Sequence, residues 1–163
     1  MLSLAPIYDT FPKYVQMILC DSMSNIHHGL LMPRKLPALN ADNRAFWQGG
    51  ETGRLLIHRC AACSRYFHPP APLCPQCASF EVGPEAVSGR GKVLSFTINY
   101  QVWTPDLEVP YVVAIIELAE QVGLQFVSNV VGMPITDVHI DMPVRVSFLN
   151  VEDVWLPLFE RAQ

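Results

Sequence analysis

The stretch that decides the fold runs from residue 60 to residue 77 and reads CAACSRYFHPPAPLCPQC. It contains two CxxC turns separated by ten residues, and each turn lets two thiolates converge on one metal ion. The ten residues are enough to fold back and bring the turns together. Because four thiolates leave no open coordination position, we expect a structural zinc ion and no activated water. The predicted ligands are Cys60, Cys63, Cys74 and Cys77.

Other uses of these cysteines fit the pattern less well. A thioredoxin-like redox pair uses one CxxC beside a βαβ unit, which the sequence does not indicate. Iron shares the four-thiolate geometry, so the spacing leaves it open as a substitute ion. Glycine often follows the second cysteine of such a turn, but Ser64 and Ala78 occupy those positions. We expect His58 and His68 outside the ligand set, and Cys20 as a free thiol.

Upstream of the cysteines the sequence predicts short elements. Leu55–Arg59 and Tyr66–Phe67 are expected as strands. A short helix is expected to run from a cap at Asn40 or Asp42 to Gln48, with Gly49-Gly50 ending it. The helix places Phe46 and Trp47 next to each other, and their role, core packing or partner docking, stays open.

The first 39 residues predict a poorly ordered leader, since they contain four prolines and show no sustained period. The residues that begin at Met23 look like a natural N-terminus. We therefore expect residues 1–22 to be an upstream extension without a folded role.

After residue 85 the composition changes to β-forming residues. Five segments rich in such residues are separated by turn signals, with no long helix between them. They are Val93–Tyr100, Tyr111–Leu118, Leu124–Val131, Val144–Val151 and Trp155–Phe159. Five short strands predict a small closed barrel, of which the OB-fold is the commonest five-stranded form. The expected fold class is mostly β, with a short helix and zinc ribbon over residues 40–85 and an OB-fold over residues 86–163.

Charge is unevenly distributed along the 163 residues, whose net charge is −4. Residues 1–85 carry seven Lys and Arg against six Asp and Glu, a net of +1, and residues 86–163 carry four against nine, a net of −5. So acidic a barrel would repel a phosphate backbone, which argues against a nucleic-acid partner.

No secretory signal is evident, and no run approaches the roughly 20 apolar residues that span a bilayer. We expect a cytoplasmic protein whose paired cysteines bind metal.

The sequence offers little catalytic chemistry. It contains no GxSxG elbow, no HExxH, no GxxxxGK[ST] loop and no dinucleotide fingerprint. One segment, SGRGK at residues 88–92, places two cations and two glycines at the entry to the first barrel strand. It is either a turn where ribbon meets barrel or a phosphate anchor formed by Arg90 and Lys92. Tyr100 and Trp103, close downstream, are candidates for a stacking face or for packing residues.

The order of these features resembles one protein family. The ordered set is Phe46-Trp47, the strand at 53–59, the two CxxC turns, the turn at 88–93, PYVVAIIEL at 110–118, MPV at 142–144 and LPLF at 156–159. Over about residues 40–160 the chain resembles the acyl-CoA-associated proteins of the domain of unknown function 35 family. The resemblance implies a rubredoxin-like zinc ribbon joined to a C-terminal OB-fold.

The resemblance implies a role more than an activity. Members accompany thiolase-like or lipid-transfer-protein-like enzymes in thiolase, acyltransferase and aldolase systems, where the partner carries the catalytic residues. It therefore implies a non-catalytic accessory subunit of an acyl-CoA complex, and CoA phosphates would explain Arg90 and Lys92. Such a subunit should expose apolar surface. The expected surface residues are Phe46, Trp47, Trp155 and Leu156–Phe159.

One position departs from the family pattern. Asp141 precedes Met142-Pro143 where the family commonly has glycine, and aspartate tolerates the left-handed backbone that such a turn requires.

Two other functions stay open. A nucleic-acid-binding module is an alternative because zinc ribbons and OB-folds both serve that purpose. An independent enzyme acting on a thioester is another, although no nucleophile or base is identifiable.

Overall fold

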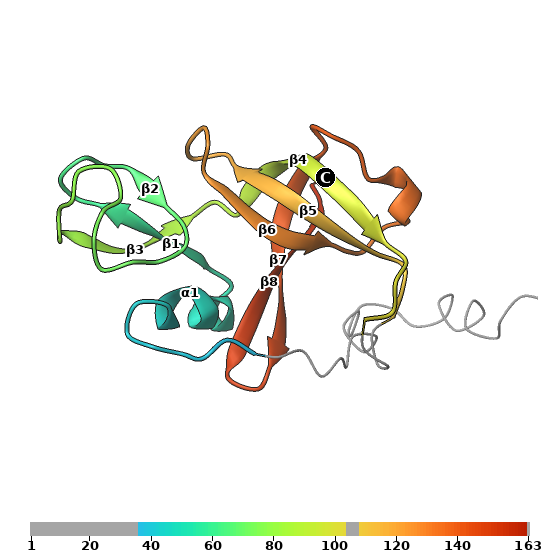
Figure 1. Ribbon diagram of the computed structural model, residues 1–163, viewed down its shortest axis with the longest axis horizontal. Coiled ribbons are helices and arrows are strands. Elements are labelled where there is room, and N and C mark those ends of the chain that lie inside the picture. The colour runs from blue at the N-terminus through green and yellow to red at the C-terminus, as the bar shows by residue number, and fades with distance from the viewer. Residues whose placement is uncertain (1–35, 104–107, 163) are drawn as a thin grey trace, which may run out of the picture. The chain divides into compact units, whose positions relative to one another are not determined.

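Figure 1 shows the computed structural model, which describes residues 36–103 and 108–162. The elements of the described residues are α1 (Arg44–Gln48), the 3₁₀ turn η1 (Gly49–Thr52), β1 (Leu55–Cys60), β2 (Tyr66–Phe67), β3 (Val82–Val87), β4 (Arg90–Asn99), β5 (Tyr111–Leu118), β6 (Gln125–Val130), the 3₁₀ turn η2 (Ile135–Asp137), β7 (Pro143–Val151) and β8 (Val154–Arg161). None of the helices in these residues is long and apolar enough to cross a membrane. The predictions about Cys20, Met23 and most of the leader fall on residues 1–35, outside the described part. The predicted domain limits stay a prediction.

The cysteine region forms a three-stranded antiparallel sheet in the order β2–β1–β3. β1 pairs with β3 from Leu55 opposite Val87 to Cys60 opposite Val82. The structure confirms the strands predicted for β1 and β2, but β3 was not predicted, because Gly83-Pro84 looks like a boundary. Proline is tolerated there because β3 lies at the edge of the sheet, where a missing N–H need not break the ladder.

The second half of the described chain closes into a barrel in the order β4–β5–β6–β8–β7. The pairs are antiparallel except that of β6 with β8, which is parallel and has Val130 opposite Phe159 as its register pair. β4 and β7 close the barrel, with Arg90 opposite Arg145. The closed five-stranded barrel expected from the sequence is therefore present.

Alternation along the strands builds the core. Every second residue of β5, from Val112 to Leu118, is buried, and the residues between them face outward. Met142 and Phe159 are fully buried in the same barrel. Two residues of β1, Leu55 and Ile57, belong to this cluster, so ribbon and barrel share one continuous core.

The apolar surface expected at the helix and the last strand is wrong for four of its residues. Phe46, Leu158 and Phe159 are only 3%, 4% and 0% exposed, and Pro157 is buried as well. Phe46 lies in the core cluster, where its ring contacts Phe126 edge to face with centroids 6.1 Å apart. The remaining candidates, Trp47, Trp155 and Leu156, are half-buried. The large apolar side chains that are exposed in the described residues are Leu73, Phe80, Tyr100, Val102, Trp103, Ile115, Val122, Val127 and Ile140.

The turn between β5 and β6 joins the barrel to the ribbon sheet. The side-chain amide of Gln121 accepts a hydrogen bond from the Tyr66 N–H and donates one to the Tyr66 carbonyl, both at 3.0 Å. These two bonds act like a neighbouring strand on the edge of β2. A carboxylate oxygen of Glu120 accepts from the Ser88 N–H at 2.6 Å. The turn therefore fixes both β2 and the linker between the two sheets.

Candidate metal centre

The two CxxC turns have the same backbone geometry. In the first turn the Cys60 N–H donates to the Arg65 carbonyl at 3.0 Å, and in the second the Cys74 N–H donates to the Ser79 carbonyl at 2.9 Å. Each bond spans five residues and closes the turn around its two sulfur atoms. The residue after the second cysteine has positive φ in both turns, 61° at Ser64 and 56° at Ala78. This explains why glycine suits both positions.

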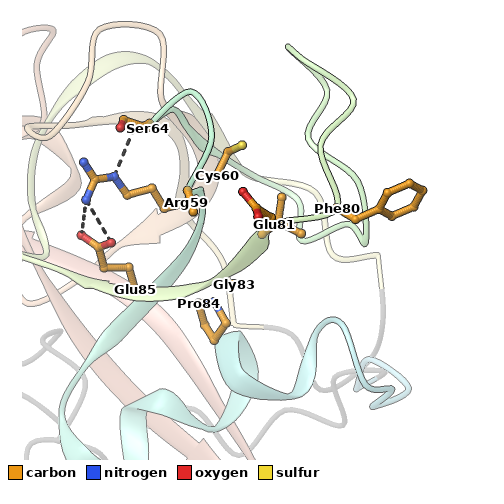
Figure 2. Close-up of a pocket in the computed structure, with 10 residues that line it drawn as sticks. Arg59, Cys60, Ser64, Phe80, Glu81, Gly83, Pro84 and Glu85 are labelled. Atoms are coloured by element: carbon orange, nitrogen blue, oxygen red, sulfur yellow. Dashed lines mark hydrogen bonds and ion pairs between the residues drawn. The ribbon is translucent and has the colours of Figure 1, made fainter.

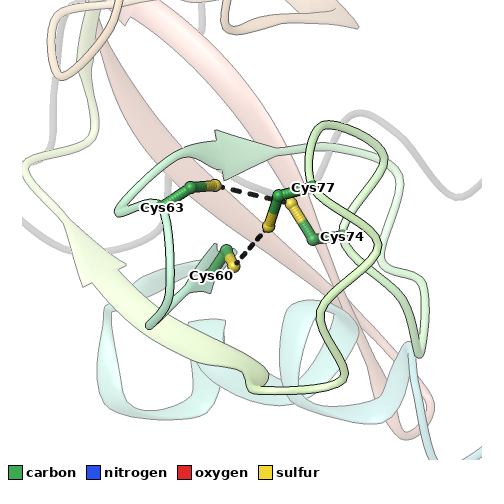
Figure 3. Close-up of side chains that lie close together, drawn as sticks. All are labelled: Cys60, Cys63, Cys74 and Cys77. Carbon is green, nitrogen blue, oxygen red and sulfur yellow. Dashed lines mark hydrogen bonds between the residues drawn. The ribbon is translucent and has the colours of Figure 1, made fainter.

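The turns bring the four predicted ligands together (Figure 3). The Sγ atoms of Cys60 and Cys77 lie 3.6 Å apart, those of Cys63 and Cys74 lie 3.7 Å apart, and all four lie within 4.8 Å of one another. A tetrahedron with Zn–S bonds of about 2.3 Å has sulfur–sulfur edges of about 3.8 Å. A disulfide would need about 2.05 Å. The set therefore fits one four-thiolate zinc ion.

The close sulfur atoms affect one another's protonation. Although burial opposes the charge, backbone N–H groups of Cys77 and Gln76 lower the pKa of Cys74 to about 7. A backbone hydrogen bond at Ser79 favours the Cys77 thiolate, but the neighbouring thiols, that of Cys63 first, raise the pKa of Cys77 to about 12. Beside its neighbouring sulfur atoms Cys77 therefore resists carrying a negative charge, which a bound divalent cation would compensate.

The two flanking histidines lie outside the cysteine set, as predicted. His58 is buried, and its Nδ1 lies 3.3 Å from the Ala71 carbonyl oxygen. His68 packs between the rings of Phe46 and Phe126, with centroids 4.6 Å and 5.5 Å away. Burial, with a smaller effect of His58, lowers the pKa of His68 to about 4. Its Nδ1 is buried without a hydrogen-bond partner, so His68 is a neutral and unsatisfied group.

The glycines of the SGRGK segment serve packing in the barrel. A Cβ on Gly89 would lie 2.4 Å from a Val146 methyl carbon, and one on Gly91 would lie 2.5 Å from the Glu117 carbonyl oxygen. Only Ser88 and Gly89 connect ribbon and barrel, whereas Arg90, Gly91 and Lys92 already belong to β4, so the interpretation of the segment as a turn holds for its first two residues alone. It leaves the cations themselves unexplained.

The two cations of this segment differ in their partners. Lys92 Nζ lies 3.1 Å from a carboxylate oxygen of Asp141, whose φ of 62° confirms that aspartate adopts the left-handed conformation expected there. Arg90 is exposed and stands opposite Arg145, with no ion pair to any described residue. Tyr100 and Trp103 lie past the other end of β4, whose ten residues span about 30 Å. They are exposed, but they form no stacking face beside the two cations.

Comparison with known proteins follows the same division of the chain. Residues 47–83 match the family model described as ChsH2, rubredoxin-like zinc ribbon domain, and residues 84–149 match that described as ChsH2, C-terminal OB-fold domain. A solved structure described as "Ltp2-ChsH2(DUF35) aldolase" is 39% identical with a TM-score of 0.70, and the match covers 78% of this chain and 100% of that one. The chain belongs to the DUF35 family.

Two curated relatives of this DUF35 chain differ in length. The probable enoyl-CoA hydratase alpha subunit of Thermomonospora curvata is 40% identical over 133 residues, which are 81% of this chain and 40% of that protein. The DUF35 domain-containing scaffold protein of Methanocaldococcus jannaschii is 34% identical over 98 residues, 58% of this chain and 67% of that protein. The DUF35 chain thus spans about two fifths of the hydratase subunit it matches.

A hollow of about 660 Å³ lies beside the metal centre of the DUF35 chain (Figure 2). Several of its polar groups are bonded to one another. The guanidinium of Arg59 donates to both carboxylate oxygens of Glu85, at 3.0 and 3.1 Å, and to the Ser64 carbonyl at 3.1 Å. Glu85 also accepts from the Tyr66 hydroxyl at 2.6 Å, and these partners lower its carboxyl pKa. The residues that line the hollow include no histidine.

Proposed function

We propose that this DUF35 chain is a non-catalytic accessory subunit of a complex that processes acyl-CoA. A thiolase-like or lipid-transfer-protein-like partner would carry the catalytic residues. The observation that carries the proposal is that 78% of this chain resembles the full length of a chain in the structure described as "Ltp2-ChsH2(DUF35) aldolase". Relatives described as a hydratase alpha subunit and as a scaffold protein support the same kind of role. A cytoplasmic location is part of the proposal.

The metal in this proposal is one structural zinc ion. Its ligands would be Cys60, Cys63, Cys74 and Cys77, whose sulfur spacing fits a tetrahedral ion. Four sulfur ligands supply rigidity and leave no position for a reacting water. The metal centre would therefore hold the two turns together while the partner enzyme performs the chemistry.

Contact with the CoA phosphates is the finer part of the proposal. Arg90 and Lys92 are its candidates, and Arg90 is the stronger one because its guanidinium has no ion pair with a described residue, whereas Lys92 is held by Asp141. Equilibrium dialysis with CoA would test this contact in the assembled complex. Arg90→Gln should weaken binding about tenfold, which is about 1.4 kcal/mol. Arg54→Gln, an equally exposed arginine of the ribbon region, is the matched control and should leave binding unchanged.

Affinity purification of the tagged full chain from its native host tests the subunit role. The expected result is an acyl-CoA enzyme in near-equal molar amount, identified by mass spectrometry. The complex should turn over an acyl-CoA that the isolated, zinc-loaded chain leaves unchanged. A chain that elutes alone as a monomer, or one that turns over acyl-CoA by itself, would end the proposal.

A further inference from the structure

The outer face of the sheet formed by β4, β5 and β6 carries no charge over two successive rows. The register places Thr97, Val113 and Asn129 side by side in one row and Ser95, Ile115 and Val127 in the next. We call these six residues the β4–β6 outer face. Four of the six are β-branched, and none is a lysine, arginine, aspartate or glutamate. Three of the six are polar, as is normal on the solvent side of an antiparallel sheet, but the face lacks the charged residues that usually accompany them.

The centre of this face is an exposed apolar pair. Ile115 and Val127 stand directly opposite each other, and their side chains are 38% and 64% exposed. Alternation explains their position, because the neighbouring Ala114, Ile116 and Phe126 face the core. The pair therefore contributes nothing to the interior of the barrel. Single exposed apolar residues are ordinary, but an opposed pair inside an uncharged face has the composition of the centre of a protein interface.

A small cavity opens beside Val127 and extends the face. It has a volume of about 180 Å³ and is lined on its apolar side by Trp47, Phe126 and Leu156. His68 also lines it, and the buried Nδ1 of that ring has no hydrogen-bond partner. Cavities that hold cofactors or drug-sized ligands measure about 300–1,000 Å³. This one is closer in size to a single large side chain.

We propose that the β4–β6 outer face is the docking surface for the enzyme subunit, and that one large apolar side chain of that enzyme enters the cavity beside Val127. This inference rests on the proposed function, since the relatives' descriptions as a subunit and a scaffold are what point to a different enzyme chain as occupant. The partner surface is a folded, mostly uncharged face. The arrangement matches interfaces in which a buried anchor is surrounded by contacts that exclude water.

Other kinds of occupant fit the face less well. A partner strand cannot be added to β5, because it is already paired with β4 on one edge and β6 on the other. Nucleic acid would need cations, and the six residues include none. A CoA molecule is larger than the cavity and would likewise lack a cation for its phosphates. The experiment below distinguishes an enzyme partner from a second copy of this chain as the occupant.

The test uses the full chain and the enzyme identified by co-purification. Val127→Lys and Ile115→Lys each place a charge in the centre of the face. The matched control is Val122→Lys, since Val122 is 86% exposed in the β5–β6 turn and lies outside the face. Zinc content and thermal unfolding of each variant verify that it is folded. We expect the Kd for the enzyme to rise at least tenfold for both face variants and less than twofold for the control.

A third variant tests the cavity. Leu156→Trp adds volume to the half-buried side chain at its wall and should weaken enzyme binding about tenfold without introducing charge. Unchanged binding by all three variants would overturn the docking surface while leaving the subunit role intact. Absence of any enzyme partner for the wild-type chain would instead end the subunit role and this inference with it. If the wild-type chain forms a homodimer that Val127→Lys dissociates, with enzyme binding unchanged, the occupant is a second copy and the proposal is wrong.

Discussion

The ribbon sheet and the barrel are stabilised in different ways. In the ribbon, β2 has two residues and β3 has no fully buried one, while backbone hydrogen bonds close two turns around four cysteines. In the barrel, alternation along longer strands buries apolar side chains. The difference teaches that a region too small to fill its own core can be ordered by metal ligands, next to a region ordered by burial.

The largest expected effect comes from breaking the metal centre. Cys74→Ser removes a buried ligand, and structural zinc contributes on the order of 10 kcal/mol to the folding of small zinc domains. We expect the amides of β2, β3 and the Cys60 end of β1 to lose protection in hydrogen exchange, while those of β5 and β6 keep most of theirs. Cys20→Ser, at the cysteine that the sequence predicts to be a free thiol, is the control and should change nothing. Loss of protection throughout the barrel would refute the separation of the two regions.

The next effect tests burial in the barrel. Ile116→Ala removes a fully buried side chain and should lower the free energy of unfolding by about 2–5 kcal/mol. Ile140→Ala makes the same chemical change at a side chain that is 59% exposed, and should cost less than about 0.5 kcal/mol. Urea unfolding with saturating zinc measures both. Equal costs at the two positions would show that burial does not dominate the barrel.

A smaller effect depends on pH and arises where the two regions meet. The pKa of His68 is about 4 in the folded chain against 6.5 ordinarily, so the folded state resists a proton that the unfolded state accepts. Stability is therefore unaffected above about pH 6.5 and falls as the pH drops toward 4. After allowance for partial exposure, the loss between pH 7 and pH 5 should be about 1–2 kcal/mol. His68→Phe should remove this part of the pH dependence.

The measurement for His68 is urea unfolding at pH 7 and pH 5 with excess zinc. His139→Phe is the control, because His139 is exposed in the loop before β7 and should retain the wild-type pH dependence. Any acid loss of zinc acts on both variants alike, so the difference between them isolates His68. Identical pH profiles for the two variants would contradict the assignment.

The smallest expected effect concerns the positive φ of the residue that follows a CxxC turn. Ala78 has a φ of 56°, which costs a non-glycine residue about 1–2 kcal/mol, partly offset by the entropy that glycine loses on folding. Ala78→Gly should therefore stabilise the chain by about 0.5–1 kcal/mol. Ala62→Gly, at an exposed position of the first turn without positive φ, should instead destabilise it by about 0.5 kcal/mol. Opposite signs in thermal unfolding are the expected result, and equal signs would refute it.

Local sequence patterns predicted the elements whose structure is set by residues close together in the chain. Tyr111–Leu118 was predicted with its observed bounds because apolar residues alternate between turn signals. The CxxC spacing predicted the sulfur cluster, since each turn brings two ligands together by itself. The left-handed conformation of Asp141 was instead implied by the family resemblance, since the family commonly has glycine at this position before Met142-Pro143.

The features that depend on distant contacts were not predictable in this way. The helix α1 ends at Gln48 as predicted, but the 3₁₀ turn η1 that follows at Gly49-Gly50 was not predictable, since Gly50 packs against Phe148 and Trp155, where a Cβ would lie 2.6 Å or less from an atom of each. β3 exists because β1 offers it a partner, despite Gly83-Pro84. The exposed pair of Ile115 and Val127 required the register of β5 with β6. No periodicity in a single strand contains that information.

The hydrogen bonds between Gln121 and Tyr66 have a consequence for exchanging modules between proteins. The linker between β3 and β4 looks like a place where ribbon and barrel could be separated. Gln121, however, lies well beyond that linker in the β5–β6 turn and completes the edge of β2. A chimaera that joins this ribbon to a foreign barrel would inherit an unsatisfied strand edge unless the recipient's turn carries an amide of the same reach. Recombination that respects only the linker would therefore yield poorly docked hybrids, and grafting Gln121 together with the ribbon should restore them.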